Sequence, residues 1–213
     1  MGRQVRAEAT REAVLQGAAQ VFARDGYAEA NLTDILREAG VTKGAMYFHF
    51  ASKEDLARGV IDAGFVRFAA AAETKMDRRS PALETMIDLS VLHADMAATD
   101  PIVRAMFRLL FEIGDYSGTE HRPFEVWQRT LEELGRRAAR EGDLVAHVDP
   151  EPVATLMLEQ AMGARIVSSA LGWTERLAEQ TGVMWRMILS AMVPPGKLDY
   201  FTQFVERRLR TQS

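Results

Sequence analysis

A short amphipathic segment, residues 31–39, ends at a glycine and is followed at once by a second segment, residues 41–50. This pairing limits the possible folds more than any other feature of the chain. Asn31 suits a helix N-cap, because its side chain can accept a hydrogen bond from the first turn. Gly40 can adopt the left-handed conformation that closes a helix, which leaves Thr42 to cap the next one. The pattern predicts a helix-turn-helix, whose second helix enters the major groove of DNA.

The second predicted helix carries residue types that can contact DNA. Lys43 in the first turn can reach a guanine edge or a phosphate, and Ala45 can touch a thymine methyl. Gly44 is small, so the backbone can approach the groove closely. Three further side chains can donate hydrogen bonds to phosphate oxygens, which sets the register without reading sequence: Tyr47, His49 and Lys53.

Three apolar residues of the same segment, Met46, Phe48 and Phe50, are predicted to face the interior. For any one residue taken alone, a core aromatic or a solvated lysine is the better interpretation. Taken together, residues 41–50 favour DNA binding, because they follow a capped helix and a glycine turn.

This region resembles the TetR family of bacterial repressors. The resemblance is carried by Gly26-Tyr27, Thr33-Asp34-Ile35, residues 41–50 and Ser52-Lys53-Glu54-Asp55-Leu56. It implies an all-α dimer, in which each subunit has a three-helix DNA-binding head, residues 1–52, and a larger ligand-binding and dimerisation body, residues 53–213. By motif position, the resemblance also implies DNA contacts from Thr33, Thr42, Lys43, Gly44, Ala45, Tyr47, His49 and Lys53.

The composition is that of an ordinary globular protein, with 47% hydrophobic and 26% charged residues. Because cysteine is absent, disulfides and thiolate metal sites are excluded. Charged residues interrupt the start of the chain, so we expect no signal peptide. No apolar run reaches the roughly 20 residues that cross a bilayer. These observations predict a cytoplasmic protein without a membrane partner.

The net charge of −4 is unusual for a DNA-binding protein. Residues 1–53 hold seven basic and six acidic groups, so the predicted head carries +1 and the remainder −5. Arg3 and Arg6 either add a mobile basic arm or form a solvated terminus. We expect affinity to depend on a dimer of matching shape and a few well-placed contacts, because no large basic patch exists.

Capping residues, prolines and glycines predict about ten helices and no strand. In addition to the two helices of the helix-turn-helix, the predicted helices cover residues 6–25, 52–76, 81–98, 101–113, 123–142, 150–171 and 174–193, and a last helix that ends near residue 210. Residues 114–122 have no periodicity and are predicted to form a loop.

Residues 154–171 are apolar or small nearly all round, which is typical of a helix buried on both sides. Residues 183–192 are similarly apolar, and Gly163 would permit close helix approach. One large core and a dimer interface explain these two helices equally well. The family resemblance favours a homodimer held by the two helices and their symmetry mates.

A second resemblance concerns the sensing side. Residues 3–19, the head motif and residues 122–127 are similar to the γ-butyrolactone autoregulator receptors, a branch of the same family. This similarity implies that Trp127 lies in a pocket for a small hydrophobic effector. Around it we expect Leu89, His93, Phe107, Leu110, Phe111 and Thr130. Such side chains line pockets and also cores, and other members of the branch respond to antibiotics or related metabolites.

The sequence supports no catalysis and no cofactor, because it contains no nucleophile elbow, phosphate loop or dinucleotide fingerprint. The four histidines lack metal-ligand spacing, although remote residues could still assemble a site. We therefore predict a homodimeric repressor that binds a pseudo-palindromic operator in double-stranded DNA and is released by a small molecule. One alternative is a pseudo-receptor or efflux regulator of the same family that answers to an antibiotic or another hydrophobic metabolite. The others are an architectural DNA-binding protein and an all-helical enzyme.

Overall fold

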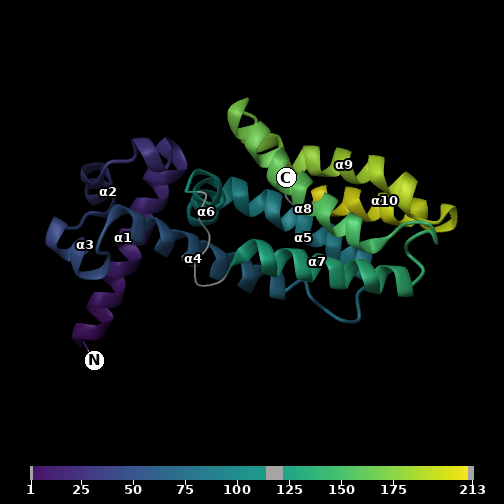
Figure 1. Ribbon diagram of the computed structural model, residues 1–213, viewed down its shortest axis with the longest axis horizontal. Coiled ribbons are helices and arrows are strands. Elements are labelled where there is room, and N and C mark those ends of the chain that lie inside the picture. The colour runs from purple at the N-terminus through teal and green to yellow at the C-terminus, as the bar shows by residue number, and fades with distance from the viewer. Residues whose placement is uncertain (1, 114–121, 211–213) are drawn as a thin grey trace. The chain divides into compact units, whose positions relative to one another are not determined.

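The computed structural model describes residues 2–113 and 122–210, and every regular element within them is helical (Figure 1). The helices are α1 (Gly2–Glu29), α2 (Leu32–Ala39), α3 (Lys43–His49), α4 (Lys53–Glu73), α5 (Ala82–Thr99), α6 (Pro101–Glu112), α7 (Pro123–Arg140), α8 (Pro150–Ala170), α9 (Leu177–Met192) and α10 (Pro195–Arg210), with a 3-10 turn, η1 (Thr174–Arg176), before α9. The all-α prediction is confirmed for this part of the chain. Apart from Arg122, the predicted loop at 114–122 lies outside the described residues.

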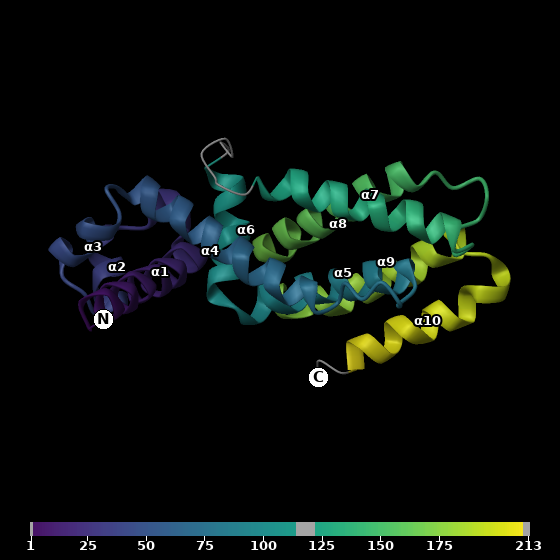
Figure 2. The same ribbon diagram turned by 90° about the horizontal axis from the view of Figure 1, so that it is seen from below.

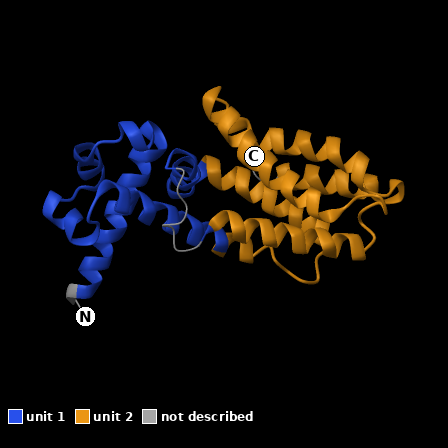
Figure 3. Cartoon of the chain, viewed as in Figure 1, with its two compact units in different colours: residues 1–69, 99–122 blue, residues 70–98, 123–213 orange. Residues whose placement is uncertain are grey.

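The chain divides into two compact units (Figure 3). Unit 1 comprises residues 1–69 and 99–122, and unit 2 comprises residues 70–98 and 123–213. Unit 1 therefore contains α1, α2, α3, α6 and most of α4, whereas the predicted head ends at residue 52. Whether that head is a domain of its own remains a prediction.

Local hydrogen bonds explain where α2 begins and ends. The Asn31 side chain accepts a hydrogen bond from the backbone N–H of Asp34 at 3.0 Å, as the N-cap prediction requires. At the other end, Gly40 has φ 64° and ψ 28°, and the N–H of Val41 donates to the carbonyl of Leu36 at 3.2 Å. These bonds satisfy the last carbonyls of the helix, so the predicted glycine stop is confirmed.

Gly26 interrupts the first helix where we predicted that it would stop, but a short further helical segment follows it. Gly26 has φ 84°, which kinks the helix, and helical backbone resumes up to Glu29. Arg108 of α6 donates from its guanidinium to the carbonyls of Ala23 at 3.0 Å and Arg24 at 2.9 Å. These two bonds satisfy carbonyls that the kink leaves without helical partners.

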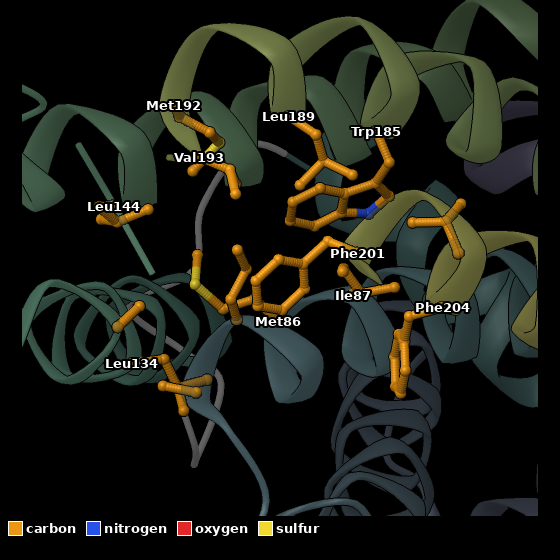
Figure 4. Close-up of a cluster of buried hydrophobic side chains, with 14 of the residues drawn as sticks. Met86, Ile87, Leu134, Leu144, Trp185, Leu189, Met192, Val193, Phe201 and Phe204 are labelled. Atoms are coloured by element: carbon orange, nitrogen blue, oxygen red, sulfur yellow. The ribbon is translucent and has the colours of Figure 1, made fainter. Parts of the chain in front are cut away.

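Unit 2 is a helical bundle with one hydrophobic core. Within it, α7 packs along α8, and α9 packs along α10 (Figures 1 and 2). Trp185 of α9 and Phe201 of α10 lie at the centre of the buried cluster, next to Met86 and Ile87 of α5 (Figure 4). Because α5, α7, α8, α9 and α10 all contribute to this cluster, burial of apolar surface holds the bundle together. None of the described helices is long and apolar enough to cross a bilayer.

Candidate DNA-binding surface and effector-binding body

The helix α3 presents one side to solvent and the other to the interior of unit 1. The Thr42 hydroxyl accepts a hydrogen bond from the backbone N–H of Ala45 at 3.3 Å, which caps the helix as predicted. Lys43, Gly44 and Tyr47 are exposed. Met46 is fully buried, so it anchors the helix and determines which side faces outward.

Phe48 corrects the prediction that three apolar residues of this segment face inward. Met46 and Phe50 are buried, but Phe48 is 77% exposed. In a helix each residue turns by about 100°, so Phe48 points roughly 200° away from Met46. Phe50 reaches the core only because it follows the helix in an extended conformation, with φ −135°. Met46, Phe48 and Phe50 are each two residues apart, and side chains at that spacing share one face only in a strand. The inward prediction therefore fails for Phe48, which lies in a helix.

The outward side of α3 is therefore a continuous arc made of Lys43, Gly44, Tyr47 and Phe48, which we call the α3 arc. A Cβ built on Gly44 meets no atom within 4 Å. The fold itself therefore leaves room for a larger side chain at this position. A glycine here instead suits close approach by another molecule.

Lys53, the first residue of α4, is held against the end of α1. Its ammonium donates to the carbonyl of Ala28 at 3.2 Å and lies 4.8 Å from the centre of the Tyr27 ring. In α3, the ammonium of Lys43 lies 5.8 Å from the centre of the Tyr47 ring. Both lysines are thus oriented by aromatic faces, which attract cations electrostatically. Tyr27 belongs to the residues that carry the family resemblance, but the sequence alone indicates no role for it.

Unit 1 contains all eight residues that were predicted to contact DNA. Five of them are exposed: Thr33, Thr42, Lys43, Gly44 and Tyr47. The other three are partly buried: Ala45, His49 and Lys53. The ring of His49 lies edge-on to that of exposed Phe48, with 5.0 Å between the ring centres. Contact of these residues with DNA remains a prediction.

The predicted effector residues are divided between the units. Phe107, Leu110 and Phe111 share α6 in unit 1, and the first two are buried. The remaining four lie in unit 2, on α5 or α7: Leu89, His93, Trp127 and Thr130. Trp127 is partly buried and contacts Phe124 edge-to-face, with ring centres 5.6 Å apart. A common pocket for the seven residues remains a prediction.

A buried imidazole and a buried guanidinium occur in unit 2. His93 of α5 and Arg165 of α8 are each less than a tenth exposed. Burial first, and then the positive charge of Arg165, lowers the pKa of His93 from 6.5 to about 3. His93 is therefore neutral near pH 7, with one donor and one acceptor nitrogen. Within the described ranges, no group of three or more acidic or histidine side chains is arranged to hold a metal ion.

Large apolar side chains are exposed along α8, on α9 and in the turn between them. This apolar face consists of Leu156, Ile166, Val167, Leu171, Trp173, Val183 and Met187. Met187 is 70% exposed, and a Cβ built on Gly163 meets no atom within 4 Å. Exposed apolar side chains that gather in one part of a protein are typical of an interaction site.

Comparison with known proteins gives consistent matches along the chain. The family model described as bacterial regulatory proteins, tetR family, matches residues 14–60, and that described as tetracyclin repressor-like, C-terminal domain, matches residues 80–194. The chain is 31% identical over 196 residues to the A-factor receptor protein of Streptomyces griseus, covering 92% of this chain and 68% of that protein.

Two solved structures extend the similarity to the fold. A γ-butyrolactone receptor described as ArpA-like has a TM-score of 0.83 and 29% identity, and the match covers 97% of this chain and 99% of that one. CprB from Streptomyces coelicolor, in complex with its biological operator sequence, has a TM-score of 0.84 and 30% identity, with 97% and 99% covered.

Proposed function

Because this chain belongs to the TetR family of bacterial regulatory proteins, we propose that it is a homodimeric transcriptional repressor. It binds a pseudo-palindromic operator and leaves the DNA when a small molecule binds its body. The observation that carries this proposal is the α3 arc, which exposes a lysine, a glycine and two aromatic rings on a capped helix. It acts in the cytoplasm and catalyses no reaction.

Each residue of the DNA-binding surface has a distinct role. Lys43 reaches a base edge, and Gly44 lets the backbone of α3 enter the groove. Tyr47 and Lys53 donate to phosphates and thereby set the register. Phe48 joins this set, because an exposed aromatic ring at the end of the α3 arc can pack on a thymine methyl or a sugar.

The DNA-binding proposal is tested by selecting bound duplexes from a random pool with the wild-type protein and two lysine variants. Lys53→Ala should weaken binding to all sequences, because its partner is a phosphate. Lys43→Ala should also relax the base preference, with a loss of about 1–3 kcal/mol at the selected operator. Lys75→Ala in unit 2 is the matched control and should bind as the wild type does. Wild-type binding strength in both test variants would refute these roles.

The apolar face supports a homodimer through α8 and α9. Two copies related by a twofold axis would cover the same face on each other, as a closed symmetric dimer requires. Leu156, Val167 and Met187 would then leave water. A dimer also matches a pseudo-palindrome, because each half-site takes one α3.

The effector is a γ-butyrolactone-type molecule, a proposal that is supported by similarity to the A-factor receptor protein and to the γ-butyrolactone receptor structures. Trp127 offers a flat apolar face and one N–H donor, which suit a lactone with an alkyl tail. Leu89, His93, Thr130 and the α6 residues Phe107, Leu110 and Phe111 are its proposed neighbours.

Trp127→Ala distinguishes a pocket residue from a core residue. If Trp127 lines a pocket, the variant should bind the operator with near-normal affinity, and butyrolactones should no longer release it. If Trp127 belongs to the core, the variant should lose roughly 3–5 kcal/mol of unfolding free energy, and its DNA binding should be damaged as well. Tyr200→Ala, which removes an exposed aromatic residue of the same unit outside the apolar face, is the control. If furans or polyketide antibiotics release the wild type and lactones do not, the repressor proposal stands and the lactone assignment fails.

A further inference from the structure

We infer that Tyr27 is a positioning residue for operator binding: its ring, with the carbonyl of the next residue, holds the ammonium of Lys53 in place for a phosphate. The inference rests on the proposed function, in which Lys53 contacts the DNA backbone. It adds a residue of α1 that does not itself need to touch DNA.

The position of Lys53 in α4 explains why its side chain needs such support. As the first residue of α4, it lies where the helix dipole disfavours a positive charge. The start of α4 is fixed, because the Ser52 hydroxyl accepts from the N–H of Asp55 at 3.0 Å and the Asp55 carboxylate accepts from the N–H of Ala51 at 2.8 Å. These two bonds hold the backbone of Lys53 at the positive end of the helix.

Favourable interactions come instead from the end of α1. The ammonium of Lys53 lies 4.8 Å from the centre of the Tyr27 ring and donates to the Ala28 carbonyl at 3.2 Å. The face of the ring attracts the cation electrostatically and uses none of the ammonium's hydrogen-bond donors. An ammonium has three N–H donors, so two remain for phosphate oxygens after the carbonyl has accepted one.

The backbone of Tyr27 is itself held by a residue of α6. Its backbone N–H donates to the carboxylate of Glu112, which pairs with Arg108 at 2.7 Å. The Tyr27 ring also packs against Phe22, with ring centres 6.1 Å apart. The platform under Lys53 is thus fixed before DNA arrives. Less side-chain freedom is then lost when the phosphate contact forms.

A double-mutant cycle between positions 27 and 53 tests the inference. The measurement is the affinity for the duplex selected by the wild type, with thermal melting to confirm that each variant folds. Tyr27→Leu should weaken binding by about two- to fivefold in the wild-type background, the range expected for an exposed cation–π contact. In the Lys53→Ala background the same change should have no effect, whereas a general structural role predicts an equal loss in both backgrounds.

A series of ring variants keeps the test decisive even if Tyr27→Leu does not fold. Tyr27→Phe should bind as the wild type does, because the ring face is retained. Mono-, di- and trifluorophenylalanine at position 27 should weaken binding stepwise, because fluorine withdraws charge from the ring face while the shape is kept. Equal affinity across the series, or equal losses in the two Lys53 backgrounds, overturns the inference and leaves the repressor proposal intact. Wild-type protein that selects no duplex refutes the repressor proposal itself.

Discussion

Gly44 lies on the α3 arc with open space around it, and at this position folding and DNA binding favour different side chains. Gly44→Ala should stabilise the protein by about 0.5–1 kcal/mol, because glycine in a helix has more backbone freedom to lose. The same methyl should weaken operator binding if the backbone enters the groove. Denaturant unfolding and operator affinity should therefore move in opposite directions.

Gly196→Ala is the matched control, because a Cβ there also meets no atom within 4 Å and the residue lies in α10 of unit 2. It should leave operator affinity unchanged. An operator affinity that Gly44→Ala does not alter would show that the α3 backbone does not approach DNA closely.

His93 should make the stability of the protein depend on pH. Its folded-state pKa is lowered to about 3, mainly by burial and then by Arg165, whereas the unfolded chain takes up the proton near 6.5. Below pH 6.5 the unfolded state therefore binds more protons, and stability falls as pH falls, by up to about 1.4 kcal/mol per pH unit. Above pH 6.5 both states are neutral and the contribution disappears.

Denaturant unfolding of wild type and His93→Gln at about pH 7.5 and about pH 5 measures this contribution. The variant should lose less stability between the two pH values than the wild type. Identical losses would mean that His93 takes up its proton in the folded protein as readily as in the unfolded chain.

The residues that sequence reasoning assigned correctly depend on local interactions. Asn31 and Thr42 accept hydrogen bonds from residues three positions away, so their caps could be predicted from spacing alone. Phe48 was assigned by its apolar character, although its helical angle decides its exposure. The contact of Tyr27 with Lys53 joins different helices, and no local pattern indicates it.

At the scale of single elements, α10 is an integral part of unit 2. Phe201, Phe204 and Val205 are buried in the same cluster as Trp185 of α9 (Figure 4). The sequence predicted a last helix from its pattern but gave no reason to assign it to the core. The assignment of α10 to the core depends on tertiary packing. The division of the proposed effector residues between α6 of unit 1 and the helices of unit 2 also depends on tertiary packing.

Phe201→Ala should therefore cost roughly 3–5 kcal/mol of unfolding free energy, because it removes a ring from the packed centre of unit 2. The neighbouring aromatic Tyr200 is 51% exposed, so Tyr200→Ala should cost much less. Thermal or denaturant unfolding of the two variants measures the difference. Similar losses would mean that α10 adds little to the core.

At the scale of the whole molecule, the apolar face and the proposed half-sites both favour a dimer. Gly163→Arg should abolish dimerisation without unfolding the chain, because a Cβ at this position meets no atom within 4 Å of the same protomer. In a close helix contact between two copies, the long charged side chain would be buried without a partner. Sedimentation should then give a folded monomer with weakened operator binding.

Ala139→Arg places the same side chain at an exposed position of α7, outside the apolar face, and should remain dimeric. If Gly163→Arg also sediments as a stable dimer, the interface lies elsewhere.

The most direct measurement is the anisotropy of a labelled, selected operator duplex with the wild-type protein, titrated with a γ-butyrolactone that carries an alkyl chain. We predict that a dimer, or a pair of dimers, binds the pseudo-palindrome far more tightly than a scrambled duplex. The lactone should then release the DNA with a saturable dose response, because it binds the DNA-free state better. Equal binding to the operator and the scrambled duplex would contradict the function proposed for this chain.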